Sequence, residues 1–280
     1  MIRSLLYVPA SSERFVAKAH ERGADAIILD LEDAVAPSEK AGARANLATA
    51  VPKVGQSGAT VFVRVNSEPE RIRLDAEAAC RAGAFGLLVP KVQKPDTLQE
   101  LADLLEGTER ATGREPTVLV AMIEDPGAVL DARVIAKAPR VFAMMTGGED
   151  LATALDAEPT PEVLQFPKLM VHFAAKAAGV RSWGLLRTVA DYSDLAGIEQ
   201  SARQARAFGF DGASCVHPAV VPILNRAFSA SDEELARARS IVSLYDEAKA
   251  KGLGAVEFEG RMIDEPVAQR ARALLNRGAK

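Results

Sequence analysis

The stretch TVLVAMIEDPGAVLDARVIAKAPRVFAMMTGGED, residues 117–150, contains the pattern that decides the fold. It includes two short apolar runs, 117–124 and 141–146, with a segment of helical character between them. Apolar runs of this length predict buried strands, and the strand–helix–strand order predicts that the two strands pair in parallel. Each run leads into acidic residues, which matters for the site discussed below.

The same unit recurs along the whole chain. Apolar runs rich in β-branched residues alternate with amphipathic stretches, and the runs occupy residues 4–9, 26–31, 61–66, 86–91, 117–124, 141–146, 181–186 and 212–217. Eight such units close into a barrel more naturally than they form an open sheet. A doubly wound sheet usually shows a Gly-rich turn after its first strand, whereas this chain reads PASSER at that point. We therefore predict an α/β fold, a TIM (β/α)8 barrel with a C-terminal helical extension.

The chain beyond the eighth run is longer than one closing helix requires. Residues 231–251 begin with a capping signal and predict a long helix, 252–266 form a Gly-punctuated segment, and 267–277 predict a last helix. We expect a catalytic barrel over residues 1–228 and an extension over 229–280 that packs on a neighbouring subunit.

Composition excludes several classes of protein. The 280 residues are 48% hydrophobic and 26% charged, as in a globular enzyme and unlike a disordered chain. The net charge of −4, with both signs well mixed, argues against a nucleic-acid partner. No apolar run approaches the roughly 20 residues that cross a bilayer, and no signal peptide is recognised, so we expect a cytoplasmic protein with no membrane partner. Cys80 and Cys215 are far apart in apolar surroundings and predict buried free thiols.

Polar residues end most of the strands, and the chemistry of a barrel gathers at the carboxyl ends of its strands. These residues are Asp30, Glu32, Asp33, Arg64, Asn66, Lys91, Glu124, Asp125, Glu149, Asp150 and His217. Several facing carboxylates resist ionisation unless a cation lies among them, and oxygen ligands favour Mg²⁺ or Mn²⁺. Glu124 and Asp150 end adjacent strands and could bind one ion; the alternative is that they cap the helices that follow.

The basic residues at the strand ends also allow two interpretations each. Arg64 offers a planar fork for a substrate carboxylate, or forms a structural salt bridge to Asp30 or Glu32. Lys91 is expected to pair with a rim carboxylate, and His217 to be a loop or core histidine. GxSxG, HExxH and GxxxxGK[ST] motifs are absent from the sequence, which disfavours nucleophilic acyl transfer and nucleotide hydrolysis.

At this point the residues resemble a known family. The segments RSLLYVPASSERFVAKA, GADAIILDLEDAVAPSEKAGAR, VFVRVN, AMIEDPGAV, MTGGEDLA, GFDGASCVHP and GRMIDEP occur in this order between residues 3 and 275. They are similar to the citrate lyase β-subunit/malyl-CoA lyase group of the HpcH/HpaI aldolase superfamily. The resemblance implies a barrel that assembles as a homotrimer or homohexamer and that binds Mg²⁺ (or Mn²⁺), a CoA thioester and a 2-oxo acid.

The resemblance also implies roles for individual positions. Glu124 and Asp150 match the Mg²⁺ ligands, and Glu124 also faces the substrate. Arg64 matches a catalytic arginine that holds the carboxylate of the 2-oxo acid. Tyr7, Arg14 and Lys18 match positions on the CoA or substrate side, and Asp264 matches a catalytic aspartate that one subunit lends to the next; these four residues lie on the first strand, its helix and the C-terminal extension.

The implied reaction is a reversible retro-Claisen cleavage of a malyl-, citramalyl- or citryl-CoA to acetyl-CoA and a 2-oxo acid. Two alternatives are kept: a β-subunit that acts within a multi-subunit citrate lyase on an acyl-carrier thioester, and a CoA-independent aldolase of 4-hydroxy-2-oxo acids. The aldolases carry a histidine where this chain has Asp33, which favours the CoA-lyase branch. Departures at Gln93, Asp125, Trp183 and Arg187 leave the substrate open.

Overall fold

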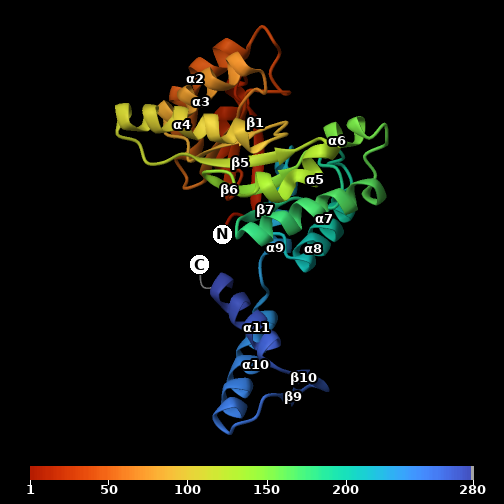
Figure 1. Cartoon of the computed structure of the whole chain (residues 1–280). Helices are drawn as coiled ribbons and strands as arrows, with labels where there is room; N and C mark the ends of the chain where they lie inside the picture. Colours follow the sequence, from red (N-terminus) through yellow and green to blue (C-terminus); the bar gives the residue numbers. More distant parts are fainter. Residues whose placement is uncertain (279–280) are drawn as a thin grey trace. The chain divides into compact units, whose positions relative to one another are not determined.

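The structure is a computed structural model that describes residues 1–278. The chain divides into two compact units, Ile2–Asn225 and Arg226–Lys280, the second together with Met1. Figure 1 shows the strands and their helices in the first unit, and α10, α11 and a short hairpin in the second. No helix among the described residues is both long and apolar enough to span a membrane.

The first unit is built on eight parallel strands. They are β1 Ser4–Pro9, β2 Ala26–Asp30, β3 Thr60–Arg64, β4 Gly86–Val89, β5 Val118–Ile123, β6 Val141–Thr146, β7 Arg181–Trp183 and β8 Ala213–Cys215. The order β7-β6-β5-β4-β3-β2-β1-β8 is that of a barrel, and β7 reaches β8 through a bridge between Trp183 and Gly212. The bond from Gly184 N–H to Gly212 O, 2.9 Å, supports this closure. The predicted TIM-like barrel is confirmed.

Helices follow the strands as the alternating pattern predicts. They are α1 Glu13–Lys18, the 3-10 turn Ala19–Glu21, α2 Lys40–Gly55, α3 Pro69–Ala82, α4 Pro95–Thr112, α5 Pro126–Ile135, α6 Gly148–Ala154, α7 Pro161–Ala178, α8 Leu195–Phe208, the 3-10 turn Pro218–Val220 and α9 Val221–Phe228. Local sequence sets many of their ends: α7 begins after Thr160, whose hydroxyl accepts from Val163 N–H, and ends at Gly179, whose φ of 74° suits glycine.

The barrel interior is closely packed. Strand side chains that point inwards form one buried cluster, which includes Leu5, Ile28, Phe62, Leu88, Val120, Met145 and Trp183. The rings of Phe62 and Trp183 meet edge to face with centroids 5.6 Å apart. Burial of this kind contributes roughly 25 cal/mol per Å² of apolar surface, so the strand ends are held on a rigid frame. Cys80 and Cys215 are free and buried, as predicted.

The second unit contains two helices and a hairpin: α10 Asp232–Ala250, β9 Val256–Phe258, β10 Arg261–Ile263 and α11 Glu265–Gly278. A capping box between Ser231 and Glu234 starts α10, as the sequence predicts. The hairpin is not predicted by the sequence analysis. Tyr245, Ile263 and Ala268 form the core of this unit. Packing on a neighbouring subunit stays a prediction.

Candidate functional site

The carboxyl ends of β2 and β3 bring an acidic and a basic side chain together. Asp30 and Arg64 are the last residues of their strands and are register partners. Arg64 donates to both carboxylate oxygens of Asp30, from Nε at 2.7 Å and from Nη2 at 2.6 Å. This bidentate geometry fixes the plane of the guanidinium, because both groups are planar and nearly fully buried.

Arg64 also contacts two further acids and an aromatic ring. Its Nη1 lies 2.9 Å from Glu32 Oε2 and 2.9 Å from Asp33 Oδ2. Its Cζ lies 5.1 Å from the centroid of the Tyr7 ring, a cation–π contact. The structure therefore shows the salt-bridge alternative for Arg64. Arg64 can also bind a substrate carboxylate, because the Asp33 side chain is 60% exposed and a ligand can displace it from Arg64.

Glu124 follows β5 and is a buried acid at this rim. Its side chain is buried, and its Oε2 atom has no hydrogen-bond partner. Burial, followed by the charges of Glu32 and Asp150, raises the pKa of Glu124 to about 8. Space for the carboxylate depends on Gly147, where an added Cβ would lie 2.5 Å from Glu124 Oε1 and 2.6 Å from its Cγ.

Glu32 is the second buried acid without enough donors. Burial raises the pKa of Glu32 to about 7, with Arg64 acting in the opposite direction and Asp33 adding to the rise. Neither of its carboxylate oxygens accepts a hydrogen bond, although Arg64 Nη1 is 2.9 Å away. The two observations agree if the contact is a close charge pair with poor hydrogen-bond geometry, which leaves oxygen lone pairs unused.

Asp150 and Lys91 lie at the more exposed side of the same cluster. Asp150 belongs to the first turn of α6. Lys91 has a φ of 52°, a strained value for a non-glycine residue that re-aims its side chain. Its Nζ is 3.7 Å from Glu32 Oε1 and 3.8 Å from Asp150 Oδ1, and both the Lys91 and Asp150 side chains are about half exposed. The expected pairing of Lys91 with rim carboxylates is confirmed.

The cluster therefore holds more negative than positive charge in a partly buried place. Among residues 1–278, no group of three or more His, Cys, Asp or Glu is arranged to hold a metal by itself. Mg²⁺, however, usually takes only one or two protein carboxylates and keeps waters or substrate oxygens in its other positions. Glu124 and Asp150, with an orphaned oxygen on Glu124, fit such an ion.

The structure brings four of the predicted site residues together at the rim, and the other three belong to α1 and to the C-terminal unit. Tyr7, Arg64, Glu124 and Asp150 share the rim, as their mutual contacts and charge effects show. Arg14 and Lys18 lie on α1 and are exposed. Asp264 belongs to the C-terminal unit, where its Oδ1 accepts from Val267 N–H at 3.2 Å and caps α11. The roles of all seven stay predictions.

Three other residues carry information that sequence reasoning missed or left vague. Asp125, rather than Glu124, caps α5 by accepting from the N–H groups of Gly127 and Ala128. Gly147 makes room for Glu124, a role that a glycine directly after a strand could have suggested. His217 is exposed, as a loop histidine should be, and stacks on the Tyr192 ring with centroids 5.0 Å apart.

Comparisons with known proteins identify the family. Residues 3–218 match the family model described as HpcH/HpaI aldolase/citrate lyase. The citrate lyase subunit beta of Escherichia coli is 34% identical over 98% of this chain and 92% of its own length. A (3S)-malyl-CoA thioesterase of Cereibacter sphaeroides is 35% identical over 94% of this chain and 89% of its own length.

A solved structure extends the likeness to three dimensions. The protein CitE of Mycobacterium tuberculosis, crystallised with magnesium, acetoacetate and coenzyme A, matches with a TM-score of 0.80 and 30% sequence identity. The match covers 99% of this chain and 98% of that one, so both units find counterparts.

Proposed function

Because the chain belongs to the HpcH/HpaI aldolase/citrate lyase family and is therefore a lyase, we propose that it cleaves and forms a carbon–carbon bond of a 3-hydroxyacyl-CoA. The substrate is of the malyl-, citramalyl- or citryl-CoA type, and the products are acetyl-CoA and a 2-oxo acid. The observation that carries the proposal is the buried Glu124 carboxylate, with an orphaned oxygen and a pKa raised to about 8, in a cluster short of positive charge.

The donor set fits Mg²⁺, with Mn²⁺ as a substitute. Glu124 and Asp150 would hold the ion, and the neighbouring Glu32 would add negative charge without being a required ligand. When bound, the ion supplies Lewis-acid polarisation of the substrate oxygen that becomes the ketone. Relatives crystallised with magnesium, such as the CitE protein of Mycobacterium tuberculosis, support this assignment.

Arg64 would bind and orient the 2-oxo acid. Asp30 holds its guanidinium in one plane, and Tyr7 covers one side of it. A substrate carboxylate can replace the exposed Asp33 at Nη1 without disturbing the bond to the buried Asp30. The Tyr7 hydroxyl stays protonated at neutral pH, because burial raises its pKa, so it can donate but cannot act as a base.

The remaining step needs a proton at the methyl carbon of acetyl-CoA. Asp264 is a carboxyl group that could deliver it, and Arg14 and Lys18 offer one helix face with two cations for the phosphates of CoA. We propose that Asp264 acts from a neighbouring copy in a homotrimer or homohexamer.

A turnover assay tests the proposal. Purified protein with Mg²⁺ should release a 2-oxo acid from at least one of the three CoA esters, with acetyl-CoA formed in equal amount. Release of free thiol without a 2-oxo acid would instead show a thioesterase. Turnover of a 4-hydroxy-2-oxo acid without CoA would show the aldolase alternative, and activity only with an acyl-carrier partner would show the obligate subunit.

Subunit mixing tests the role of Asp264. Asp264→Asn keeps a good helix cap and removes the acid, and Glu124→Gln removes the metal ligand. Each variant alone should be inactive. If Asp264 acts between copies, mixing the two variants should restore part of the activity, because some sites combine an intact rim with an intact Asp264. No recovery after subunit exchange would contradict the trans arrangement.

A further inference from the structure

Lys168 is a buried lysine that the proposed chemistry does not use. It lies on α7 with 4% of its surface exposed, and its ammonium donates to the carbonyl oxygens of Leu185 at 3.0 Å and Arg187 at 2.7 Å. Both carbonyls belong to the connection between β7 and α8. In the described part of the chain, this ammonium forms no salt bridge with a carboxylate. Burial lowers the pKa of Lys168 to about 8, with Glu149 acting in the opposite direction.

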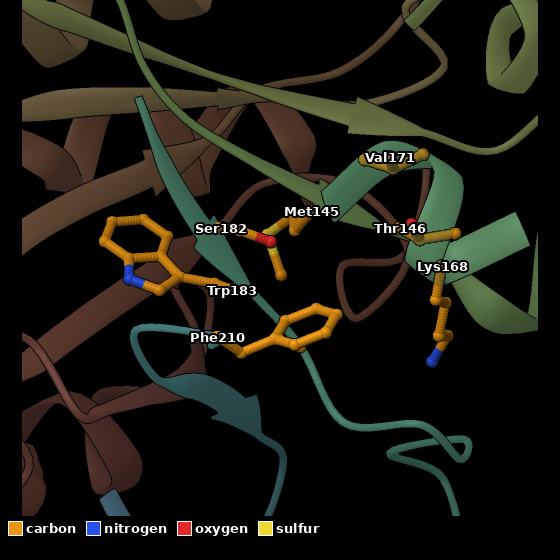
Figure 2. Close-up of a pocket in the computed structure, with 8 residues that line it drawn as sticks. Met145, Thr146, Lys168, Val171, Ser182, Trp183 and Phe210 are labelled. Atoms are coloured by element: carbon orange, nitrogen blue, oxygen red, sulfur yellow. The ribbon is translucent and has the colours of Figure 1, made fainter. Parts of the chain in front are cut away.

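The Lys168 ammonium also lies close to Gly148, at the start of α6. A Cβ added at Gly148 would lie 3.4 Å from Lys168 Nζ and 3.0 Å from Leu164 Cδ1, so the lysine lies directly behind the start of this helix. Figure 2 shows Lys168 extending from α7, with Thr146 at the end of β6 nearby. The turn that it supports contains Glu149 and Asp150.

The β7–α8 connection is also bonded directly to α6. Thr188 Oγ1 donates to Glu149 Oε1, one residue before Asp150. Within the connection, Arg187 pairs with Asp191 at 2.8 Å and with Asp194 at 2.9 Å, and Asp194 caps α8. The connection is thus an internally bonded piece of chain, held by Lys168 at one point and bonded to Glu149 at another.

We infer that Lys168 is a positioning residue: its ammonium holds the β7–α8 connection against α7, and the connection, through the Thr188–Glu149 bond, fixes Asp150 on the first turn of α6 for metal binding. The inference rests on the proposed function of Asp150. Without the ammonium, the carbonyls of Leu185 and Arg187 lose their buried donor, the connection loosens, and the Thr188–Glu149 bond no longer restrains the turn that carries Asp150.

The test uses the full-length chain and Mn²⁺ as the probe. Lys168→Met removes the charge with little change in length, Lys168→Arg restores a buried donor, and Lys176→Met is the matched control. Lys176 lies on the same helix, and its Nζ bonds to Asp211 rather than to the connection. Mn²⁺ affinity is measured by paramagnetic resonance, and amide hydrogen exchange is followed over residues 148–154 and 185–194.

We expect Lys168→Met to weaken Mn²⁺ binding roughly 10–100-fold, as loss of a supporting partner around a metal ligand usually does. Exchange should accelerate in both segments, Lys168→Arg should recover both properties, and Lys176→Met should change neither. Wild-type affinity in Lys168→Met, or unchanged exchange in 185–194, would overturn the inference.

The outcomes separate this inference from the proposed function. If wild-type protein binds no Mn²⁺, the proposed metal site fails, while the exchange measurement still decides whether Lys168 restrains the two segments. If Lys168→Met does not fold, Thr188→Val cuts the same link at its exposed end. That variant should weaken Mn²⁺ binding and accelerate exchange in 148–154; if it does neither, the link does not position Asp150.

Discussion

Acids at the two ends of the barrel have pKa values that are shifted in opposite directions. At the amino end, Arg3 forms a fork with Asp25 at 2.8 Å, and Glu109 accepts from Arg140 at 2.6 Å and from Thr117 N–H at 2.7 Å. Burial alone would raise the pKa values of both acids, but these hydrogen bonds lower them below their usual range. At the carboxyl end, the pKa values of Glu32 and Glu124 rise to about 7 and about 8.

The difference lies in the supply of donors and not in burial, which acts in the same direction at both ends. Acids at the amino end have one or more matched partners, so their charges support the fold. At the carboxyl end, Glu32 and Glu124 have carboxylate oxygens without a hydrogen-bond donor, and their charges repel one another. Buried acids of this kind are costly for the isolated protein and are typical of a functional site, and the proposed cation would complete the rim.

Removal of the Glu124 carboxylate, at the carboxyl end of the barrel, is expected to have the largest effect. Glu124→Gln should reduce turnover by about 10³-fold, equivalent to about 4 kcal/mol of transition-state stabilisation, because a metal ligand is lost. The metal-free variant should unfold at the same temperature as wild type or higher, since an isolated buried carboxyl group is removed. Turnover and the melting temperature in EDTA are the measurements. A stability loss with turnover retained would show that Glu124 is structural.

Removal of the Glu109 charge, at the amino end of the barrel, is expected to lower stability and to leave turnover unchanged. Glu109→Gln should destabilise the fold by about 2 kcal/mol, because the Arg140 ion pair and the charge-assisted bond to Thr117 N–H are weakened together. Turnover per folded molecule should not change. Urea unfolding followed by circular dichroism, together with the turnover assay, checks both parts, and a large drop in turnover at low urea would contradict the separation of roles between the two ends.

The third prediction moves an acid of the rim without removing it. Gly147→Ala places a Cβ against Glu124 and should reduce turnover roughly 10–100-fold by displacing the carboxylate. Gly107→Ala is the control, because nothing lies within 4 Å of the added Cβ on α4 and the change should stabilise the helix by up to about 1 kcal/mol. Equal turnover in the two variants would show that Glu124 adapts freely.

Burial disfavours the charged form of Lys168, so stability should depend on pH. The pKa of Lys168 is about 8 in the folded protein, below the ordinary lysine value of about 10.4. Between these values the unfolded chain binds more protons, so stability rises with pH. Wild type should therefore gain about 1 kcal/mol over Lys168→Met between pH 8 and pH 9. Urea unfolding of both proteins measures the difference, and a constant difference would mean that the lysine is not titrating there.

Much of the fold could be predicted because most residues of the barrel strands are buried, so that the strands read as continuous apolar runs, as in the fully buried residues 26–30. The hairpin of β9 and β10 was missed because its strands have only three residues each and lie in a Gly-punctuated segment. A local signal exists at Glu259 and Gly260, which form the two-residue turn and have left-handed φ values of 50° and 71°.

Of the site, only the residues that lie at the ends of strands could be predicted from the sequence. Asp30 and Arg64 end adjacent strands, so their meeting follows from the topology. Whether Arg64 faces a ligand or a carboxylate depends on how far Glu32 and Asp33 are buried, which no pattern encodes. The role of Lys168 could not be predicted for a similar reason. Its partners are backbone carbonyls of the β7–α8 connection, and every residue has a carbonyl, so the sequence does not indicate which ones it contacts.

A divalent cation is expected to complete the carboxyl end of the barrel. Calorimetric titration of Mg²⁺ into wild type, Asp150→Asn and Glu109→Gln, in the presence of pyruvate or oxaloacetate, tests it most directly. We expect saturable binding to wild type and Glu109→Gln, and binding weakened by at least about tenfold in Asp150→Asn. Equal affinity in all three proteins, or no binding to wild type, would contradict it.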